Sequence, residues 1–262
     1  MMASMRIDRI KVCLNGGRSR AEHPEVPVTP AELAAAAASA VAAGAEAVHM
    51  HPRDQGGRES LAAAHIAAAV LAVRQACPTT PIGVSTGLWI TGDDPRSRLE
   101  AVMAWSDLAP PSRPDFASVN VSESGFTDLV RTLVSMGIAV EAGIWSIADA
   151  DALAASGLAE KCTRLLIEVI GASAVAAPAV ADEILTRLDV LGVPGPRLLH
   201  GEDEATWPLV ALAGRLGLPT RIGLEDTITD LRGEPVRDNA ELVRLALDGW
   251  NSSRARTPGP IA

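Results

Sequence analysis

The feature that most constrains the fold is a regular alternation of short β-branched apolar runs with longer Ala- and Leu-rich stretches. The short runs have the composition of buried parallel strands, and the longer stretches are typical of helices that cover a sheet. Strands are predicted over 9–15, 47–51, 82–86, 116–121, 138–144, 164–170, 197–199 and 220–224. Eight such units in 262 residues, with no break in composition, predict an α/β protein with a single-domain (β/α)8 TIM barrel over 1–262. A doubly wound open sheet is the alternative.

Helix signals agree with this alternation. Thr29-Pro30-Ala31-Glu32 is a capping box with proline at the first helical position, so a helix should begin there and end near Gly44. Further helices are predicted over 60–77, 95–108, 147–156, 178–191, 205–216 and 238–250. One more helix is expected after the fourth strand, ending near residue 136. Residues 252–262, with two prolines, are expected to form a peripheral C-terminal tail or an oligomer contact.

Charge and cysteine content exclude several classes of protein. A net charge of −9 argues against a general nucleic-acid or anionic membrane surface. No apolar run approaches the roughly 18 residues of a membrane span, and the first residues carry charges where a signal peptide needs an apolar core. The three cysteines are far apart and resemble reduced core thiols. We therefore expect a cytoplasmic protein.

Two histidines at the end of the second predicted strand point to a metal site. His49 and His51 are two residues apart, so both imidazoles should project to the same side of the strand. Glu225 ends another apolar run and offers a third ligand. Two histidines and one carboxylate leave coordination positions open, which suits catalysis more than structural support. The same ligands could hold zinc or non-haem Fe(II), and the alternative is two histidines hydrogen-bonded to loops.

Other polar residues also fall at predicted strand ends, which form the active-site face of a barrel. Asp226 beside the metal ligands is a natural general base, and Arg221 on the same strand would hold it in position. Glu141 and Glu168 lie inside apolar strands and need partners; pairing with Arg or Lys on a neighbouring strand is the structural alternative. The remaining candidates are Asn15, Arg18, Ser85, Thr86, Ser118, Asn120 and His200, of which Ser85 and Thr86 could equally be turn formers.

Most of the chain resembles the β-keto acid cleavage enzymes. The resemblance is carried by 14–18, 27–33, 43–54, 84–87, 118–120 and 221–226, above all by the blocks that hold His49-Met-His51 and Glu225-Asp226. It implies a zinc-dependent (β/α)8 barrel that joins a β-keto acid with acetyl-CoA to give acetoacetate and a new acyl-CoA. It also implies a homo-oligomer, a dimer or tetramer.

The resemblance assigns roles to most of these candidate residues. It implies that His49, His51 and Glu225 bind zinc, that Asp226 is the general base with Arg221 as its partner, and that the Ser85 hydroxyl orients the reacting carbonyl. It implies a substrate pocket lined by Arg18, Thr86, Ser118, Asn120 and Glu141.

Arg18 departs from the family pattern. It stands where the founding member has a glutamate that meets the amino group of 3-keto-5-aminohexanoate. We therefore expect an anionic or neutral polar substrate, and not that compound. Two other readings stay open: a metal-dependent barrel hydrolase of the amidohydrolase kind, and a non-catalytic protein that binds a metal or small molecule. Neither would depend on acetyl-CoA.

Overall fold

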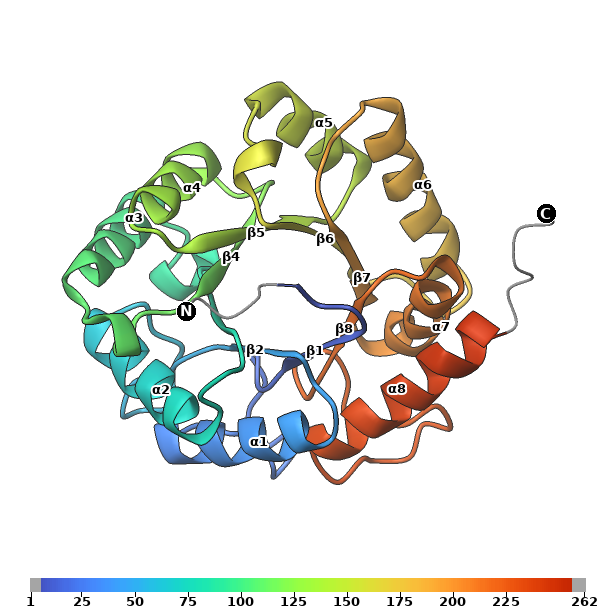
Figure 1. Cartoon of the computed structure of the whole chain (residues 1–262), viewed down its shortest axis with the longest axis horizontal. Coiled ribbons are helices and arrows are strands. Elements are labelled where there is room, and N and C mark those ends of the chain that lie inside the picture. The colour runs from blue at the N-terminus through green and yellow to red at the C-terminus, as the bar shows by residue number, and fades with distance from the viewer. Residues whose placement is uncertain (1–5, 256–262) are drawn as a thin grey trace.

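A computed structural model describes residues 6–255 and shows eight parallel strands in a ring, with helices on the outside (Figure 1). Neighbouring strands pair in the order β7-β6-β5-β4-β3-β2-β1-β8. The backbone N–H of Leu199 in β7 donates to Pro219 O, 3.0 Å away, at the entry to β8 and so nearly closes the ring. The strands are β1 Ile10–Cys13, β2 Ala47–Met50, β3 Ile82–Ser85, β4 Phe116–Asn120, β5 Ala139–Ile144, β6 Arg164–Val169, β7 Arg197–Gly201 and β8 Thr220–Ile222. The predicted (β/α)8 barrel is confirmed.

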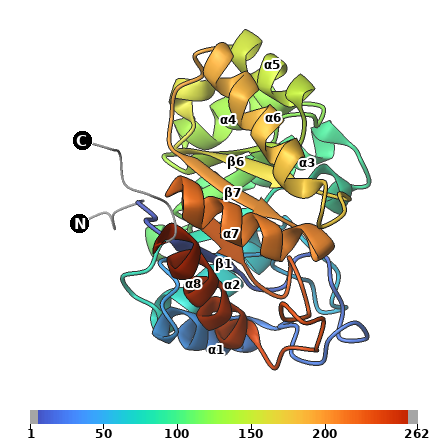
Figure 2. The ribbon, with the colours of Figure 1, turned by 90° about the vertical axis from the view of Figure 1, so that its right-hand side faces the viewer.

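One helix follows each strand. The helices are α1 Pro30–Ala42, α2 Ala63–Ala76, α3 Pro95–Met103, α4 Phe126–Ser135, α5 Ile147–Ser156, α6 Ala177–Val190, α7 Thr206–Leu216 and α8 Asn239–Ala255. Short 3-10 helices lie in the connections: η1 Leu88–Thr91, η2 Ala104–Asp107, η3 Pro110–Ser112, η4 Ala159–Lys161 and η5 Asp203–Ala205. Figure 2 shows α6, α7 and α8 side by side on one flank of the barrel.

Helix ends follow local chemistry. The capping box of α1 is present, because Thr29 Oγ1 accepts from the Glu32 N–H and Glu32 Oε2 accepts from the Thr29 N–H. The helix predicted to reach residue 108 stops at Met103 and continues as η2, where the buried Trp105 donates from Nε1 to Leu61 O at 2.9 Å. A C-terminal tail was predicted from residue 252, but α8 runs on to Ala255; the rest of the predicted tail, 256–262, lies outside the described residues.

The barrel interior is not wholly apolar. Lys11, Glu141 and Arg164 lie near the start of their strands with side chains that are almost completely buried, and they pair with one another. The polar side chains at the other end of the strands form the site described next. Within 6–255, no helix combines the length and the apolar character that crossing a bilayer requires.

Candidate metal centre and active site

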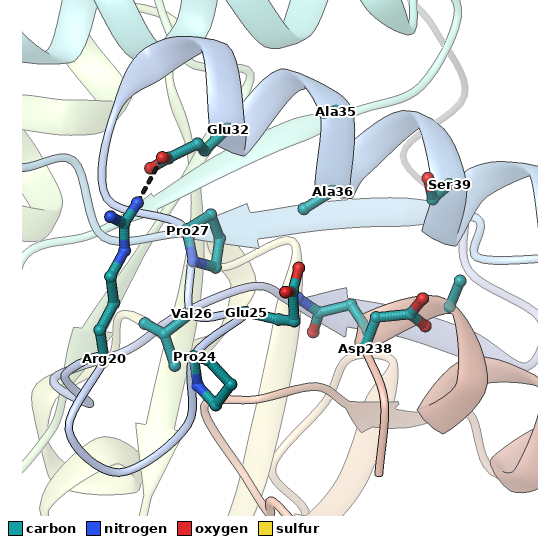
Figure 3. Close-up of a pocket in the computed structure, with 12 residues that line it drawn as sticks. Arg20, Pro24, Glu25, Val26, Pro27, Glu32, Ala35, Ala36, Ser39 and Asp238 are labelled. Atoms are coloured by element: carbon teal, nitrogen blue, oxygen red, sulfur yellow. Dashed lines mark hydrogen bonds and ion pairs between the residues drawn. The ribbon is translucent and has the colours of Figure 1, made fainter.

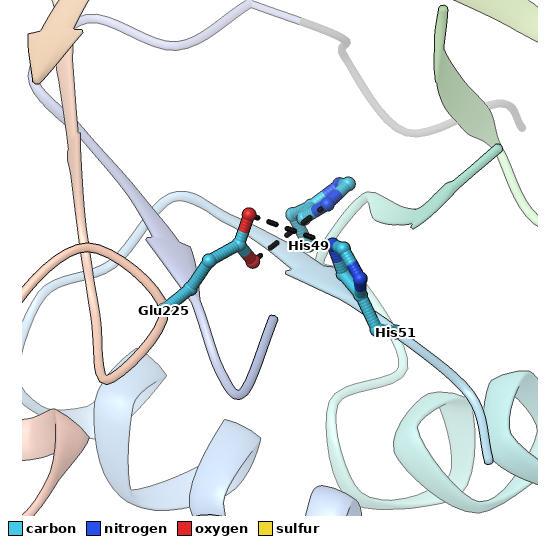
Figure 4. A group of neighbouring side chains, drawn as sticks. All are labelled: His49, His51 and Glu225. Atoms are coloured by element: carbon cyan, nitrogen blue, oxygen red, sulfur yellow. Dashed lines mark ion pairs between the residues drawn. The ribbon is translucent and has the colours of Figure 1, made fainter. Parts of the chain in front are cut away.

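The end of β2 and the segment after β8 bring three potential metal ligands together (Figure 4). His49 lies on β2 and His51 follows it, so both rings enter the barrel from the same strand face. His49 Nε2 lies 3.9 Å from Glu225 Oε2, and His51 Nε2 lies 3.5 Å from Glu225 Oε1. One ligand atom from each residue lies within 4.8 Å of the others. The predicted juxtaposition of these three residues is therefore present.

The chemistry of these donors fits a metal ion. Among the described residues, buried Glu225 Oε2 has no hydrogen-bond partner. An unpaired carboxylate oxygen is costly to bury, so a cation at this position would satisfy it. A glycine lets Glu225 reach the site: Gly16 has φ +54°, and a Cβ there would lie only 2.4 Å from Glu225 Cγ. The backbone at Gly16 thus leaves the space that the Glu225 side chain occupies.

Protonation differs between the two histidines. Burial lowers the pKa of His49 well below its usual range, so its ring is neutral and ready to bind a cation. Burial also lowers the pKa of His51, but the negative charges of Glu225 and Glu59 outweigh burial and raise this pKa to about 9. Since a metal binds neutral imidazole, loading the site requires loss of a proton from His51.

Arg221 organises the carboxylates beside the metal ligands. Its Nη2 lies 2.7 Å from Asp226 Oδ1 and 3.0 Å from Glu225 Oε1, and its Nε donates to Asp226 Oδ1 at 2.8 Å. The same Nη2 lies 3.3 Å from Glu168 Oε1 and 3.5 Å from Glu202 Oε1. One guanidinium therefore contacts four carboxylates. The cluster keeps an excess of negative charge, which a metal ion or a proton could offset.

Asp226 has the properties of a proton acceptor. It is fully buried behind Arg221, and its Oδ2 makes no hydrogen bond to any described residue. Burial, with help from the neighbouring carboxylates, raises its pKa to about 7 despite Arg221. A base of this pKa can take up and release a proton near neutral pH.

A cavity of about 400 Å³ opens above these groups. The three metal ligands, Arg221, Arg18, Ser85, Ser118 and Asn120 all line it, as do Glu22, Trp89, Trp145, Glu168, Glu202 and Asp203. A second hollow of about 430 Å³ lies on the barrel flank by α1 and the start of α8 (Figure 3). It is lined by residues such as Arg20, Glu32 and Asp238 and lies away from the metal ligands, so the chemistry belongs to the first cavity.

Comparison with known proteins agrees with this geometry. The family model described as "beta-keto acid cleavage enzyme" matches residues 9–253. The chain belongs to the β-keto acid cleavage enzyme family. It is 24% identical over 251 residues to the 3-keto-5-aminohexanoate cleavage enzyme of Acetoanaerobium sticklandii, covering 89% of this chain and 88% of that protein. The family resemblance predicted from the sequence is confirmed.

Solved structures show the same fold. The ternary complex of ObcA with a C4-CoA adduct and oxalate has a TM-score of 0.71 at 17% identity, covering 86% of this chain and 63% of ObcA. The binary complex of ObcA with oxaloacetate has a TM-score of 0.70 at 18% identity, covering 89% and 65%. The 3-dehydroquinate dehydratase of Geobacillus kaustophilus has a TM-score of 0.59 at 9% identity, covering 97% and 92%. The chain spans less than two thirds of the ObcA structures.

Two residues expected in the substrate pocket of this family member lie elsewhere. Glu141 is completely buried, accepts from Lys11 Nζ at 2.5 Å and pairs with Arg164, which is the structural alternative left open by the sequence. Thr86 is also buried, and its Oγ1 donates to Ser118 O at 2.6 Å. Neither lines the cavity, because Glu141 lies too early in β5 and Thr86 follows Ser85 with the opposite side-chain direction.

Arg18 reaches the cavity, but its charge is already matched. Its Nη2 lies 2.5 Å from Asp203 Oδ1, its Nη1 lies 3.4 Å from Glu22 Oε1, and its Nε donates to Glu225 O at 3.2 Å. The charge reversal relative to the family's founding member is therefore offset by two carboxylates that the sequence did not connect with Arg18.

Several residues at the site were missed or left open. Trp145 Nε1 donates to Glu168 Oε2 at 3.1 Å, and buried His200 lies between Glu168 and Asp226 without a hydrogen bond to a described residue. Burial and the charge of Glu168 raise the pKa of Glu202 to about 8. Glu168, near the end of β6, was already a candidate from the sequence, whereas Glu202 was missed; it directly follows β7, and that position on the active-site face was the signal that could have identified it.

Proposed function

We propose that the protein is a zinc-dependent enzyme that joins a β-keto acid with acetyl-CoA, giving acetoacetate and a new acyl-CoA by carbon–carbon bond cleavage and acyl transfer. Family membership supports the β-keto acid chemistry. The observation that carries the proposal is the convergence of His49, His51 and Glu225 in a cavity beside the Arg221–Asp226 pair. An organic acid could bind there through its oxygens, with Asp226 buried behind Arg221, which lines the cavity.

The three ligands would hold the metal with coordination positions left for substrate oxygens. When bound, it would act as a Lewis acid that stabilises negative charge developing on the keto oxygen. The reaction changes no oxidation state, so zinc suits it and the redox chemistry of iron is not required.

The protein's own groups would move the proton and orient the substrate. Asp226 would accept the proton at its unpartnered Oδ2, while Arg221 holds the other oxygen through Nε and Nη2. Ser85 Oγ accepts from the Gly87 N–H at 3.2 Å, which leaves its own proton to be donated to the reacting carbonyl. Ser118 and Asn120 line the same cavity and would contact the substrate.

The cavity favours a neutral polar side chain on the substrate. Asp203 and Glu22 offset the charge of Arg18, and Glu168 and Glu202 also line the cavity, so little attraction remains for an anionic group. Arg18 still occupies the place of the founding member's glutamate, so 3-keto-5-aminohexanoate should be a poor substrate. Efficient turnover of that compound would refute the proposed neutral polar side chain of the substrate. The proposed type of reaction would still stand.

We also propose a cytoplasmic homo-oligomer, a dimer or tetramer. Buried, unpaired Cys13, Cys77 and Cys162 are compatible with a reducing compartment, and the family resemblance implies assembly. Light scattering during gel filtration would measure the mass, and a monomer at micromolar concentration would refute the assembly.

The test is an assay of zinc-loaded protein with neutral, anionic and cationic β-keto acids, with and without acetyl-CoA, following acetoacetate. We expect acetyl-CoA-dependent acetoacetate that is greatest with a neutral polar substrate. Hydrolysis of the substrates without acetyl-CoA would instead favour a barrel hydrolase. Zinc binding with no turnover of any substrate would favour a binding protein.

A further inference from the structure

The segment after β2 folds back on itself and returns to the metal ligands. Arg53 and Glu59 form an antiparallel bridge, and the Ser60 N–H donates to Pro52 O at 2.9 Å. The turn between them is closed by Asp54, whose Oδ1 accepts from the N–H groups of the residues at 56 and 58 at 2.8 and 3.0 Å. This turn fixes the backbone at Glu59 beside the strand end that carries the metal ligands.

Glu59 holds the ring of one metal ligand. Its Oε1 lies 2.5 Å from His51 Nδ1, on the side of the ring opposite Nε2, which faces Glu225. A carboxylate at this distance accepts the Nδ1 proton and so leaves the Nε2 lone pair for a metal. Glu59 Oε2 accepts from Trp89 Nε1 at 3.1 Å, so both of its oxygens are engaged.

Trp89 in turn packs on the same histidine. Its ring lies 6.3 Å from the His51 ring, with 24° between the planes. A glycine lets the indole lie there, because a Cβ at Gly87 would lie 2.3 Å from its Cη2. His51, Glu59 and Trp89 thus form a closed set in which each member contacts the other two.

The other histidine has no such support. Among the described residues, the buried His49 Nδ1 makes no hydrogen bond. The ring of His51 is therefore held by a carboxylate, whereas the ring of His49 has an edge contact with His51 in addition to its place on the strand.

We propose that Glu59 is a positioning residue for the metal site. It sets the tautomer and the ring orientation of His51, and Trp89 in turn holds Glu59 by a hydrogen bond. This inference rests on the proposed metal site but not on the proposed reaction. Loss of such a carboxylate typically weakens metal binding about 10- to 100-fold.

The test is zinc affinity, measured by competition with a chromophoric chelator. Glu59→Gln should bind zinc about 10- to 100-fold more weakly, and Trp89→Phe, which keeps the stacking but loses the N–H, should fall between it and the wild type. Glu46→Gln is a matched control, because Glu46 also accepts hydrogen bonds with both oxygens but precedes β2, at the opposite end of the strand from His49. It should lose less than about threefold.

A purely structural role for Glu59 predicts something different. It would lower the melting temperature of metal-free Glu59→Gln but leave the zinc affinity of the folded variant unchanged, whereas the positioning role weakens zinc binding at temperatures where the variant is fully folded. Equal zinc affinity of Glu59→Gln and wild type, or an equal loss in Glu46→Gln, would overturn the proposal. Failure of the wild type itself to bind zinc would refute the metal site and the proposed function with it.

Discussion

Two clusters of buried charge lie inside the same barrel and differ in how completely they are paired. In the lower cluster, Lys11, Glu141 and Arg164, two cations share one carboxylate and engage both of its oxygens. In the upper cluster, around Arg221, one cation meets four carboxylates. Buried oxygens of Glu225 and Asp226 have no partner there among the described residues. Burial alone therefore does not mark a functional charge; the carboxylate oxygens without a partner are what distinguish the upper cluster from the lower one.

The largest effect should come from the base of the upper cluster. Asp226→Asn keeps the size and the contact with Arg221 but cannot take up the proton, so kcat should fall by about 10²- to 10⁴-fold. Zinc content and melting temperature should stay close to those of the wild type. Retention of more than half of the activity would remove Asp226 from the mechanism.

Removing a charge from the lower cluster should lower the stability of the fold and leave the catalytic activity unchanged. Lys11→Met leaves Glu141 buried with one of its two cations, and removing a partner from a buried pair destabilises a protein by about 3–5 kcal/mol. Urea unfolding measures this loss, and activity per folded molecule should change little. A stable variant with greatly reduced activity would contradict the division between the clusters.

A milder effect on catalysis is expected from the cavity hydroxyl. Ser85→Ala should lower kcat about a hundredfold if the hydroxyl stabilises charge on the reacting carbonyl. Thr86→Val is the matched control, since Thr86 does not line the cavity and its hydroxyl donates to Ser118 O, a bond whose loss should cost about 1 kcal/mol of stability. Equal activity losses in both variants would refute the role of Ser85.

The smallest effect concerns the pH dependence of metal binding. The raised pKa of His51, about 9, means that the ring is protonated at neutral pH without metal. Zinc must displace that proton, so its apparent affinity should rise about tenfold per pH unit below that pKa and level off above it. Calorimetry in buffers of different ionisation enthalpy should show about one proton released from His51. No proton release would contradict this protonation state.

The fold was predictable because each strand is a short apolar run and each helix has its own signals. The convergence of His49, His51 and Glu225 was also predictable, since the carboxyl ends of parallel strands meet at one face of a barrel. Glu141 was misplaced because the sequence shows that a residue is on a strand but not its depth in the barrel. Thr86 could have been set aside, since it alternates with Ser85.

Contacts made by loops could not be predicted from the sequence. Arg18 meets Asp203 across 185 positions of the chain, and nothing local in either segment indicates that pairing. Glu59 is only eight residues from His51, but its return depends on the turn at Asp54. Such contacts depend on backbone paths that residue patterns at strand ends do not encode.

The most direct test of the unpaired upper cluster as the catalytic centre is acetoacetate formation before and after removal of the metal. Protein stripped with a chelator should lose acetyl-CoA-dependent activity and regain it when about one equivalent of zinc per chain is added. His51→Ala should stay inactive after the same addition. Activity that survives complete removal of the metal would contradict the account.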